Sequence, residues 1–315
     1  MAYVQWLHDG GLKRDNVGGK GASLSAMIDA GFPVPDGFCI TADGYRRFAQ
    51  GAVGSEIESV LKGLNTGDRA AVSAASQRIV ELVGAAKLPR DLCDEIVAGY
   101  ETLCDRLGEH CAVRSSAISE DGSAASFAGL YETYLNVKGA DSVLEYVQRC
   151  YQSLWAERAV SYRTRRGGAV DEAMAVVVMG LVPSDTSGIA FTAHPVTGSL
   201  DQIVINASYG LGEAIVSGRV TPDMFVIAKG SGAVVSRDIY PKTIALCPHP
   251  DGSGVLEEEV PPAMVSAPSI TDDDAVAVAR MAERVESHYG SPQDIEWAMA
   301  AGKLYLLQSR PITTL

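Results

Sequence analysis

A lysine follows two glycines near the start of the chain, in the stretch NVGGKGASL (Asn16–Leu24). This spacing suggests phosphate binding, because a helix N-terminus offers N–H groups and a favourable dipole to an anion. The stretch is not a P-loop, since that pattern needs a glycine where Arg14 stands and a hydroxyl residue where Gly21 stands. Lys20 is therefore a candidate phosphate ligand, and the alternative is a glycine turn with a solvated lysine.

A second cation, Arg114, ends the apolar stretch CAVRSS and leads into a loop of Ser, Ala and Gly. Small residues let backbone amides approach a ligand closely, and the arginine fork matches phosphate oxygens. In the same loop Gly129 would allow that approach and Thr133 would offer a hydroxyl. Residues 114–133 are thus a candidate phosphate loop. The alternative is a flexible surface linker, although apolar strands flank the loop on both sides.

Two stretches near the end of the sequence, DIEWAMA and KLYLLQSRP, predict a hairpin over residues 294–311. Strand alternation separates Glu296 from its apolar neighbours and places Gln308 and Arg310 on one face. A carboxylate and an amide oxygen suit Mg²⁺, which usually takes one or two carboxylates together with substrate phosphates. Arg310 would then neutralise phosphate beside the metal. The alternative is a half-exposed hairpin with a polar outer face.

The length of the hairpin turn decides whether Glu296 and Gln308 meet. A two-residue turn at Ala301–Gly302 with regular pairing places Glu296 opposite Leu307, on the wrong face. A three-residue turn that starts one residue earlier, with a left-handed glycine at a bulge, places it opposite Leu306. Gln308 is then a diagonal neighbour, about 7–8 Å away between backbones. Spacing alone leaves both turns open.

The elements that would position these residues change in kind along the chain. Helical patterns cover residues 43–107 and 272–287, and Asp141 is expected to cap a further amphipathic helix. Strands dominate from Ala173 onward, and residues 248–270, rich in Pro, Gly and acids, predict a loop.

This order of elements predicts an α+β protein in two lobes. The sequence has 315 residues, enough for two domains or subdomains. We expect a helix-rich lobe over residues 1–178 and a strand-rich lobe over residues 179–315.

The formal net charge of −13 excludes some partners. A field of that sign repels nucleic acid and anionic membranes, so any phosphate ligand must be held by a few placed cations. The longest apolar run, Ala173–Met179, is far too short to span a membrane. The sequence begins without a signal-peptide pattern, and its six cysteines form no CxxC pair. We therefore expect a cytoplasmic protein without a zinc site or a disulfide framework.

Two further patterns carry little chemistry. The stretch YGLGEAIVSG from Tyr209 lacks the third glycine of a dinucleotide fingerprint, so it predicts a tight loop before a helix start with Glu213 exposed. The five histidines show no metal-binding spacing, and His194, just before Pro195, is expected to fill a turn.

Several stretches, taken in order, resemble one known family. They are GGKGASL, VPDGFCITADGYRRF, VRSSAISED, SFAGLYETYLNV, SGIAFTAHPVTG, YGLGEAIVSG, VTPD, DIEWA and LYLLQSRPIT. This pattern is similar to the ATP-binding, ATP-grasp-like domain of phosphoenolpyruvate synthase, pyruvate phosphate dikinase and rifampin phosphotransferase, and it spans nearly the whole chain. The resemblance implies two lobes that close on ATP, with the phosphates under a small-residue loop.

The resemblance also implies a reaction. ATP is cleaved to AMP and phosphate, and the β-phosphoryl group passes to a histidine on a separate swivelling domain, then to an acceptor such as pyruvate, a phenol or a rifamycin-like hydroxyl. Matched by motif, the nucleotide contacts would be Lys20, Arg114, Gly129, Thr133, Glu296, Gln308 and Arg310. Of these, Glu296 and Gln308 would also hold Mg²⁺. Lys20, Arg114 and Arg310 would stabilise charge on the transferring group.

The sequence departs from the family pattern in two places. Met179 stands where the family commonly has a glutamine beside the adenine, so base contacts there are expected from backbone amides. The Thr-Cys-His motif of the phosphohistidine domain does not occur in these residues, so we expect that domain in a partner chain or in another part of the protein. Two alternatives remain: an ADP-forming ATP-grasp ligase, and a non-catalytic nucleotide-binding module.

Overall fold

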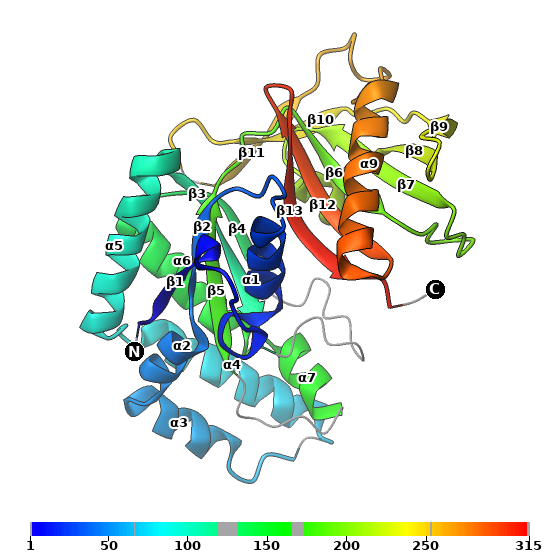
Figure 1. Cartoon of the computed structure of the whole chain (residues 1–315). Helices are drawn as coiled ribbons and strands as arrows, with labels where there is room; N and C mark the ends of the chain where they lie inside the picture. The colour runs from blue at the N-terminus through cyan, green and yellow to red at the C-terminus, as the bar shows by residue number, and fades with distance from the viewer. Residues whose placement is uncertain (1, 66, 119–131, 166–172, 253, 314–315) are drawn as a thin grey trace. The chain divides into compact units, whose positions relative to one another are not determined.

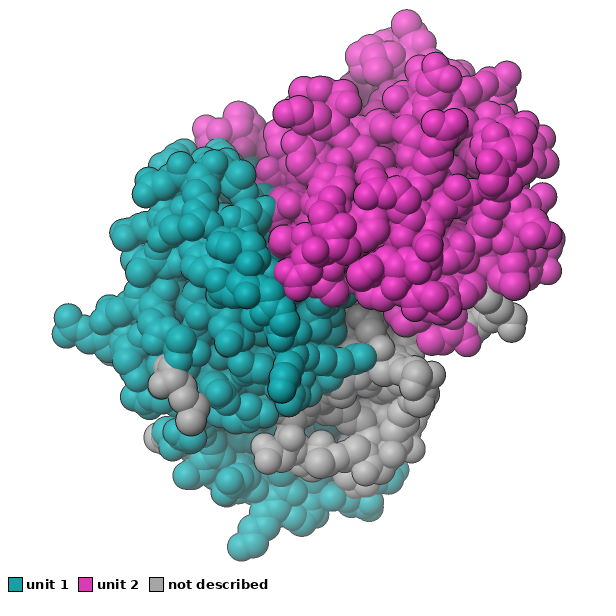
Figure 2. All heavy atoms as spheres, in the orientation of Figure 1, with its two compact units in different colours: residues 1–25, 36–180 teal, residues 26–35, 181–315 magenta. Residues whose placement is uncertain are grey.

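The computed structural model describes residues 2–65, 67–118, 132–165, 173–252 and 254–313. Helices and strands are mixed throughout this part of the chain, so the α+β class predicted from the sequence is confirmed (Figure 1). The chain separates into two compact units, which Figure 2 colours separately. The first comprises residues 1–25 and 36–180, and the second comprises residues 26–35 and 181–315.

The first unit is built on a five-stranded antiparallel sheet of strand order β1-β2-β5-β3-β4. Its strands are β1 (Val4–Trp6), β2 (Gly37–Ile40), β3 (His110–Ala117), β4 (Thr133–Lys138) and β5 (Met174–Gly180). Its helices are η1 (Leu7–Asp9), α1 (Arg14–Asp29), α2 (Ala42–Ala49), α3 (Ala52–Leu61), α4 (Arg69–Ala85), α5 (Arg90–Leu107), α6 (Ala140–Ser153) and α7 (Glu157–Arg165). Helix α1 belongs to this unit up to Ser25, and its last four residues belong to the second unit.

One face of this sheet is covered by helices. The long helices α5 and α6 pack against the strands (Figure 1). Alternate residues of the three inner strands point toward them: Phe38, Val113 and Val178 share a buried core with Leu92 of α5 and Val147 of α6. Because side chains alternate along a strand, the remaining residues of β2, β3 and β5 lie on the opposite face.

The second unit contains a six-stranded antiparallel sheet of order β13-β12-β6-β7-β8-β9, with helix α9 packed against it. Its strands are β6 (Thr186–Phe191), β7 (Gln202–Tyr209), β8 (Asp223–Ala228), β9 (Val234–Asp238), β12 (Gln293–Ala300) and β13 (Lys303–Pro311). A separate pair is formed by β10 (Ile244–Pro248) and β11 (Val255–Glu259). The helices are α8 (Glu213–Val216) and α9 (Asp272–Tyr289).

Residues 26–35 belong to the second unit because their contacts lie there. The Leu306 N–H donates to the Pro33 carbonyl at 2.9 Å. The Phe32 ring meets His288 edge-on, with 5.8 Å between centroids, and the Arg284 guanidinium lies 5.1 Å from the centre of the same ring. This division differs in detail from the lobes expected over 1–178 and 179–315.

Three local predictions compare as follows. The helix expected over 272–287 is confirmed as α9, which begins with a capping box between Thr271 and Asp274. Asp141 was expected to cap α6, but Gly139 occupies the N-cap position, so that prediction is wrong. The prediction of a loop over residues 248–270 is wrong in part, because Val255–Glu259 within that range form strand β11, which pairs with β10.

Candidate functional site

Helix α1 carries Lys20 just after a break in its backbone. Gly18 has φ 72° and ψ 179°, which lies outside the helical region, so α1 divides there into two segments. A positive φ of this size favours glycine, which has no Cβ to clash with the backbone. Lys20 is only 8% exposed. The alternative of a solvated lysine on a glycine turn is therefore wrong.

Arg114 lies on β3, between strands β5 and β4 of the first sheet, and is 7% exposed. It pairs in register with Thr133 of β4 on one side and with Val177 of β5 on the other. Met179 is two residues beyond Val177 and is buried. Because register partners and alternate residues share a face, Arg114, Thr133 and Met179 lie on the same side of the sheet, opposite the helical layer.

The second segment of α1 lies over this same face. Cys39 of β2 pairs with Val177 and so points to the face that carries Arg114. A Cβ atom built on Gly21 would lie 2.7 Å from the Cys39 Sγ atom, so the helix backbone rests directly on that strand. The fold of the first unit thus brings Lys20 to the face of Arg114. Gly129 lies outside the described residues.

The hairpin near the end of the sequence has the two-residue turn. Ala300 pairs with Lys303, and the turn residues Ala301 and Gly302 both have positive φ, at 48° and 73°. Two positive φ values in a two-residue connection are those of a type I′ turn, whose twist matches the flanking strands. The Ala301 N–H also donates to Asp185 Oδ2 at 2.8 Å. The three-residue turn considered above is therefore wrong.

A bulge restores the pairing that this turn alone would prevent. Trp297 pairs with Leu306, but the register shifts at the next position, so that Glu296 pairs directly with Gln308 and Leu307 is the extra residue. Residues directly opposite on neighbouring strands have Cβ atoms about 4.5–5.5 Å apart. Glu296 and Gln308 are therefore closer partners than the diagonal pairing expected from the sequence.

Arg310 is held by a residue that the sequence reasoning missed. Its register partner is Asp294, and its Nε and Nη2 atoms both donate to Asp294 Oδ2, at 2.8 and 2.6 Å. Asp294 is 9% exposed. The signal was present in the sequence, because Asp294 and Glu296 alternate in DIEW and so share a strand face.

The hairpin therefore presents two carboxylates, an amide and a guanidinium on one face. Glu296 with Gln308 offers the hard oxygen ligands that Mg²⁺ prefers, while Asp294 orients Arg310 beside them. Within the described residues no group of three or more His, Cys, Asp or Glu side chains is arranged to hold a metal.

A second charged network lies deep in the second unit. Lys242 and Asp223 are both completely buried, and the Lys242 Nζ donates to Asp223 Oδ1 at 2.5 Å. Asp223 also accepts from the Ser269 N–H and Oγ, both at 2.7 Å, and from the Tyr240 N–H at 3.1 Å. Its oxygens are satisfied by groups of the fold itself, which indicates a structural pair that joins the start of β8 to the segments around Tyr240 and Ser269.

Three other expectations concern single side chains. Glu213 is half-buried rather than exposed, and burial raises its pKa while the Arg219 charge opposes that shift. His194 fills a turn as expected, since its Nδ1 accepts from the N–H groups of Val196 and Thr197. The cysteines are free thiols, and burial raises the pKa of Cys111 to about 12.

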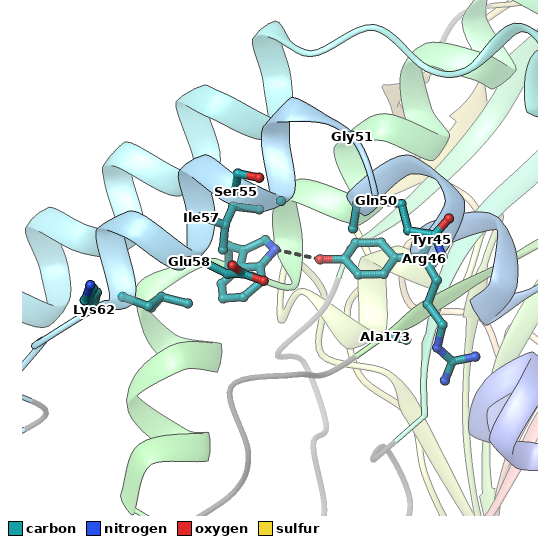
Figure 3. A pocket seen from close by; sticks show the side chains of 13 residues that line it. Tyr45, Arg46, Gln50, Gly51, Ser55, Ile57, Glu58, Lys62 and Ala173 are labelled. Carbon is teal, nitrogen blue, oxygen red and sulfur yellow. Dashed lines mark hydrogen bonds between the residues drawn. The ribbon is translucent and has the colours of Figure 1, made fainter.

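A cavity of about 840 Å³ opens among the helices of the first unit, lined in part by Tyr45, Glu58 and Lys62 (Figure 3). Within it the Trp155 Nε1–H donates to the Tyr45 hydroxyl at 3.0 Å. None of the described candidate site residues lines this cavity. Among the helices of the described residues, none combines the length and the apolar character that a membrane span needs.

Comparison with known proteins identifies the domain type. A sequence model of the family described as "Pyruvate phosphate dikinase, AMP/ATP-binding domain" matches residues 14–315. A probable phosphoenolpyruvate synthase of Methanocaldococcus jannaschii is 41% identical over 100% of this chain and 27% of its own length. The phosphoenolpyruvate synthase of Pyrococcus furiosus is 38% identical over 100% of the chain and 44% of its length. A rifampicin phosphotransferase of a Streptomyces species is 44% identical over 95% of the chain and 34% of its length. The chain thus spans less than half of each of these relatives.

Proposed function

The chain belongs to the pyruvate phosphate dikinase AMP/ATP-binding domain family, and from that premise we propose that it is the ATP-binding part of a dikinase-type phosphotransferase. In this reaction the β-phosphoryl group of ATP passes to a histidine of a phosphohistidine domain, on a partner chain or elsewhere in the protein, and then to the acceptor. AMP and phosphate are released, and one water is consumed at the γ-phosphate.

The burial of two cations on one sheet face carries this proposal. Lys20 and Arg114 are each less than one-tenth exposed, in a protein of net charge −13. Cations placed in a low-dielectric setting interact strongly with a polyanion, and phosphoryl transfer depends mostly on positioning and electrostatic stabilisation. We assign Lys20 and Arg114 to the phosphates, keep Gly129 and Thr133 as further nucleotide contacts implied by the family motif, and assign Met179 to the adenine side.

The second unit would supply the metal and a third cation. Glu296 and Gln308 would hold Mg²⁺, which neutralises phosphate charge when it is bound. Arg310, oriented by Asp294, would stabilise the charge that develops on the transferred phosphoryl group. These roles correspond to a two-lobed ATP-grasp-like domain with the lobes 1–178 and 179–315.

The acceptor is decided outside these residues. Relatives named for phosphoenolpyruvate and for rifampicin are 41% and 44% identical to the same chain. A segment shared at similar identity by proteins with different named substrates is the part they use in common. We therefore infer ATP as its ligand and leave acceptor recognition to other domains.

Titration with ATP in the presence of Mg²⁺ tests the residue assignments. We expect Lys20→Ala and Arg114→Ala each to weaken binding about tenfold to a hundredfold, the effect of one charge-assisted hydrogen bond. Lys13→Ala is the matched control, because Lys13 is exposed and lies just before α1. Unchanged affinity in both variants would contradict the assigned site.

Product analysis tests the reaction itself. The chain is mixed with ATP, Mg²⁺ and the phosphohistidine domain of one of the relatives, and the products are followed by ³¹P NMR. We expect AMP, phosphate and a phosphohistidine signal. Accumulation of ADP would indicate a ligase-type activation instead, and tight ATP binding with no turnover would indicate a nucleotide-binding module.

A further inference from the structure

We propose that Ser116 is a positioning residue, which caps the second segment of α1 from strand β3 and thereby fixes Lys20 relative to Arg114. This inference rests on the proposed function, because it assigns Ser116 a role through the phosphate contact of Lys20. It adds to that function a residue that touches no substrate.

The break at Gly18 leaves the second segment of α1 without a cap of its own. An N-cap side chain normally accepts a hydrogen bond from the N–H of the second or third helical residue. With Gly18 in the N-cap position, the third helical residue is Gly21. Glycine has no side chain that could accept this bond, so the acceptor must come from elsewhere.

Ser116 supplies this hydrogen-bond acceptor, although it lies 95 residues from Gly21 along the chain. Its Oγ accepts from the Gly21 N–H at 3.1 Å and donates to the Val17 carbonyl at 2.7 Å. One hydroxyl thus bridges the last turn before the break and the first turn after it. Ser116 is fully buried, so water does not replace these bonds readily if the hydroxyl is removed.

The close approach of the two backbones explains why residue 18 is glycine. A Cβ atom built there would lie 2.1 Å from the Ser116 carbonyl oxygen and 2.3 Å from its Oγ. The φ of 72° at Gly18 also disfavours any other residue. Gly18 and Ser116 therefore form one junction between α1 and β3.

Along the chain this junction adjoins both cations, since Gly18 is two residues before Lys20 and Ser116 is two residues after Arg114. Lys20 immediately precedes Gly21, and Arg114 is two residues before Ser116, on the same strand face. Strand β3 is held in register by β5, where Ser116 pairs with Ala175. Loss of the hydroxyl would therefore leave Arg114 in place and release the segment that carries Lys20.

A double-mutant cycle on ATP affinity, measured by calorimetry with Mg²⁺, tests this role. The four proteins are the wild type, Ser116→Ala, Lys20→Gln and the double variant. We expect Ser116→Ala to weaken binding about fivefold, the factor that corresponds to the loss of one helix cap. In the Lys20→Gln background the same change should alter affinity by less than about twofold, because the group that it positions is gone.

Ser25→Ala is the matched control for a merely structural effect. Ser25 lies on the same helix, is 1% exposed, and its Oγ donates to the Leu7 carbonyl at 2.8 Å. We expect it to lower the melting temperature about as much as Ser116→Ala does while leaving ATP affinity within about twofold of the wild type. Equal affinities for Ser116→Ala and Ser25→Ala would overturn the proposal.

The remaining outcomes separate this inference from the proposed function. The positioning role is wrong if Lys20→Gln weakens ATP binding but Ser116→Ala does not. It is also wrong if Ser116→Ala weakens binding equally in the wild type and in the Lys20→Gln variant. In both cases the ATP site stands. If the wild type and Lys20→Gln bind ATP alike, the phosphate assignment fails and this inference fails with it. Should Ser116→Ala not fold, Ser116→Cys replaces the hydroxyl by a larger thiol that hydrogen-bonds only weakly, and wild-type affinity in that variant would overturn the role.

Discussion

A few charged residues of this protein, among them Asp294, Asp223 and Lys242, are buried, and for these the partner side chain decides what the charge does. Burying a charge costs several kcal/mol unless ionic or polar groups replace its hydration. Asp294 fulfils this need for Arg310 through two hydrogen bonds to one oxygen. Such a pair fixes the direction of the guanidinium, which matters more for a phosphate ligand than its charge alone.

The energetic coupling of Arg310 and Asp294 is a prediction at this scale. In a double-mutant cycle with Asp294→Asn and Arg310→Gln, we expect a coupling of about 1–2 kcal/mol in the free energy of unfolding. The control is the pair Arg46–Asp43, whose side chains are 52% and 37% exposed, against 28% and 11% for Arg310 and Asp294. Its coupling should be about 0.5 kcal/mol or less. Equal couplings from urea denaturation would contradict the positional argument.

At the scale of elements, the hairpin shows how two irregularities compensate. The tight turn alone would set Glu296 opposite Leu307, and the bulge shifts the register by one residue, so that Glu296 meets Gln308. Bulges are frequent beside functional sites because they re-aim a side chain without unpairing the strands around it. One of the two turn residues, Ala301, is not glycine although its φ is 48°.

The positive φ of Ala301 leads to a prediction about the stability of the protein. Type I′ turns prefer Asn-Gly, because asparagine tolerates the left-handed region better than alanine does. We expect Ala301→Asn to stabilise the protein by about 0.5–1 kcal/mol and to raise its melting temperature by roughly 1–3 °C. Ala300→Asn, in the regular strand, is the control and should give no increase. A melting temperature at or below that of the wild type for Ala301→Asn would refute this explanation of the turn.

At the scale of the whole molecule, stability and recognition depend on different features. The second unit encloses the Asp223–Lys242 pair, which is completely buried, and the Lys242 Nζ donates to Asp223 Oδ1 and to the Tyr240 carbonyl. Removing one partner leaves the other charge buried, which is more costly than losing the attraction itself. This pair is therefore a stability element, in contrast to the charges assigned to ATP.

We expect Lys242→Met to lower the free energy of unfolding by about 3–5 kcal/mol. Arg237→Met removes a cation from an exposed pair with Asp272, at 57% and 45% exposure, and should cost less than about 1 kcal/mol. Urea denaturation followed by circular dichroism measures both. A loss of similar size in the two variants would show that burial does not set the cost.

The amino-acid sequence by itself determined the family, the α+β class and the main local elements. Ordered motifs are specific because each fixes several residue types at a fixed spacing, and periodicity alone places α9 and the strands of the hairpin. It also selected Lys20, Arg114, Glu296, Gln308 and Arg310 as candidates, whose assignment to ATP and Mg²⁺ stays a prediction. These features depend on neighbours in the chain, where spacing is informative.

Only the tertiary structure decided which distant residues meet. The Ser116 hydroxyl bridges a break in α1 across 95 residues, Leu307 forms the extra residue of the bulge, and Lys242 is buried on Asp223. The local periodicity of apolar residues assigns a residue to a face of its element. The register of a strand and the position of a helix on the sheet are set by packing over the whole unit. The physical reason is that such contacts are stabilised together with the core, so no single stretch of sequence encodes them.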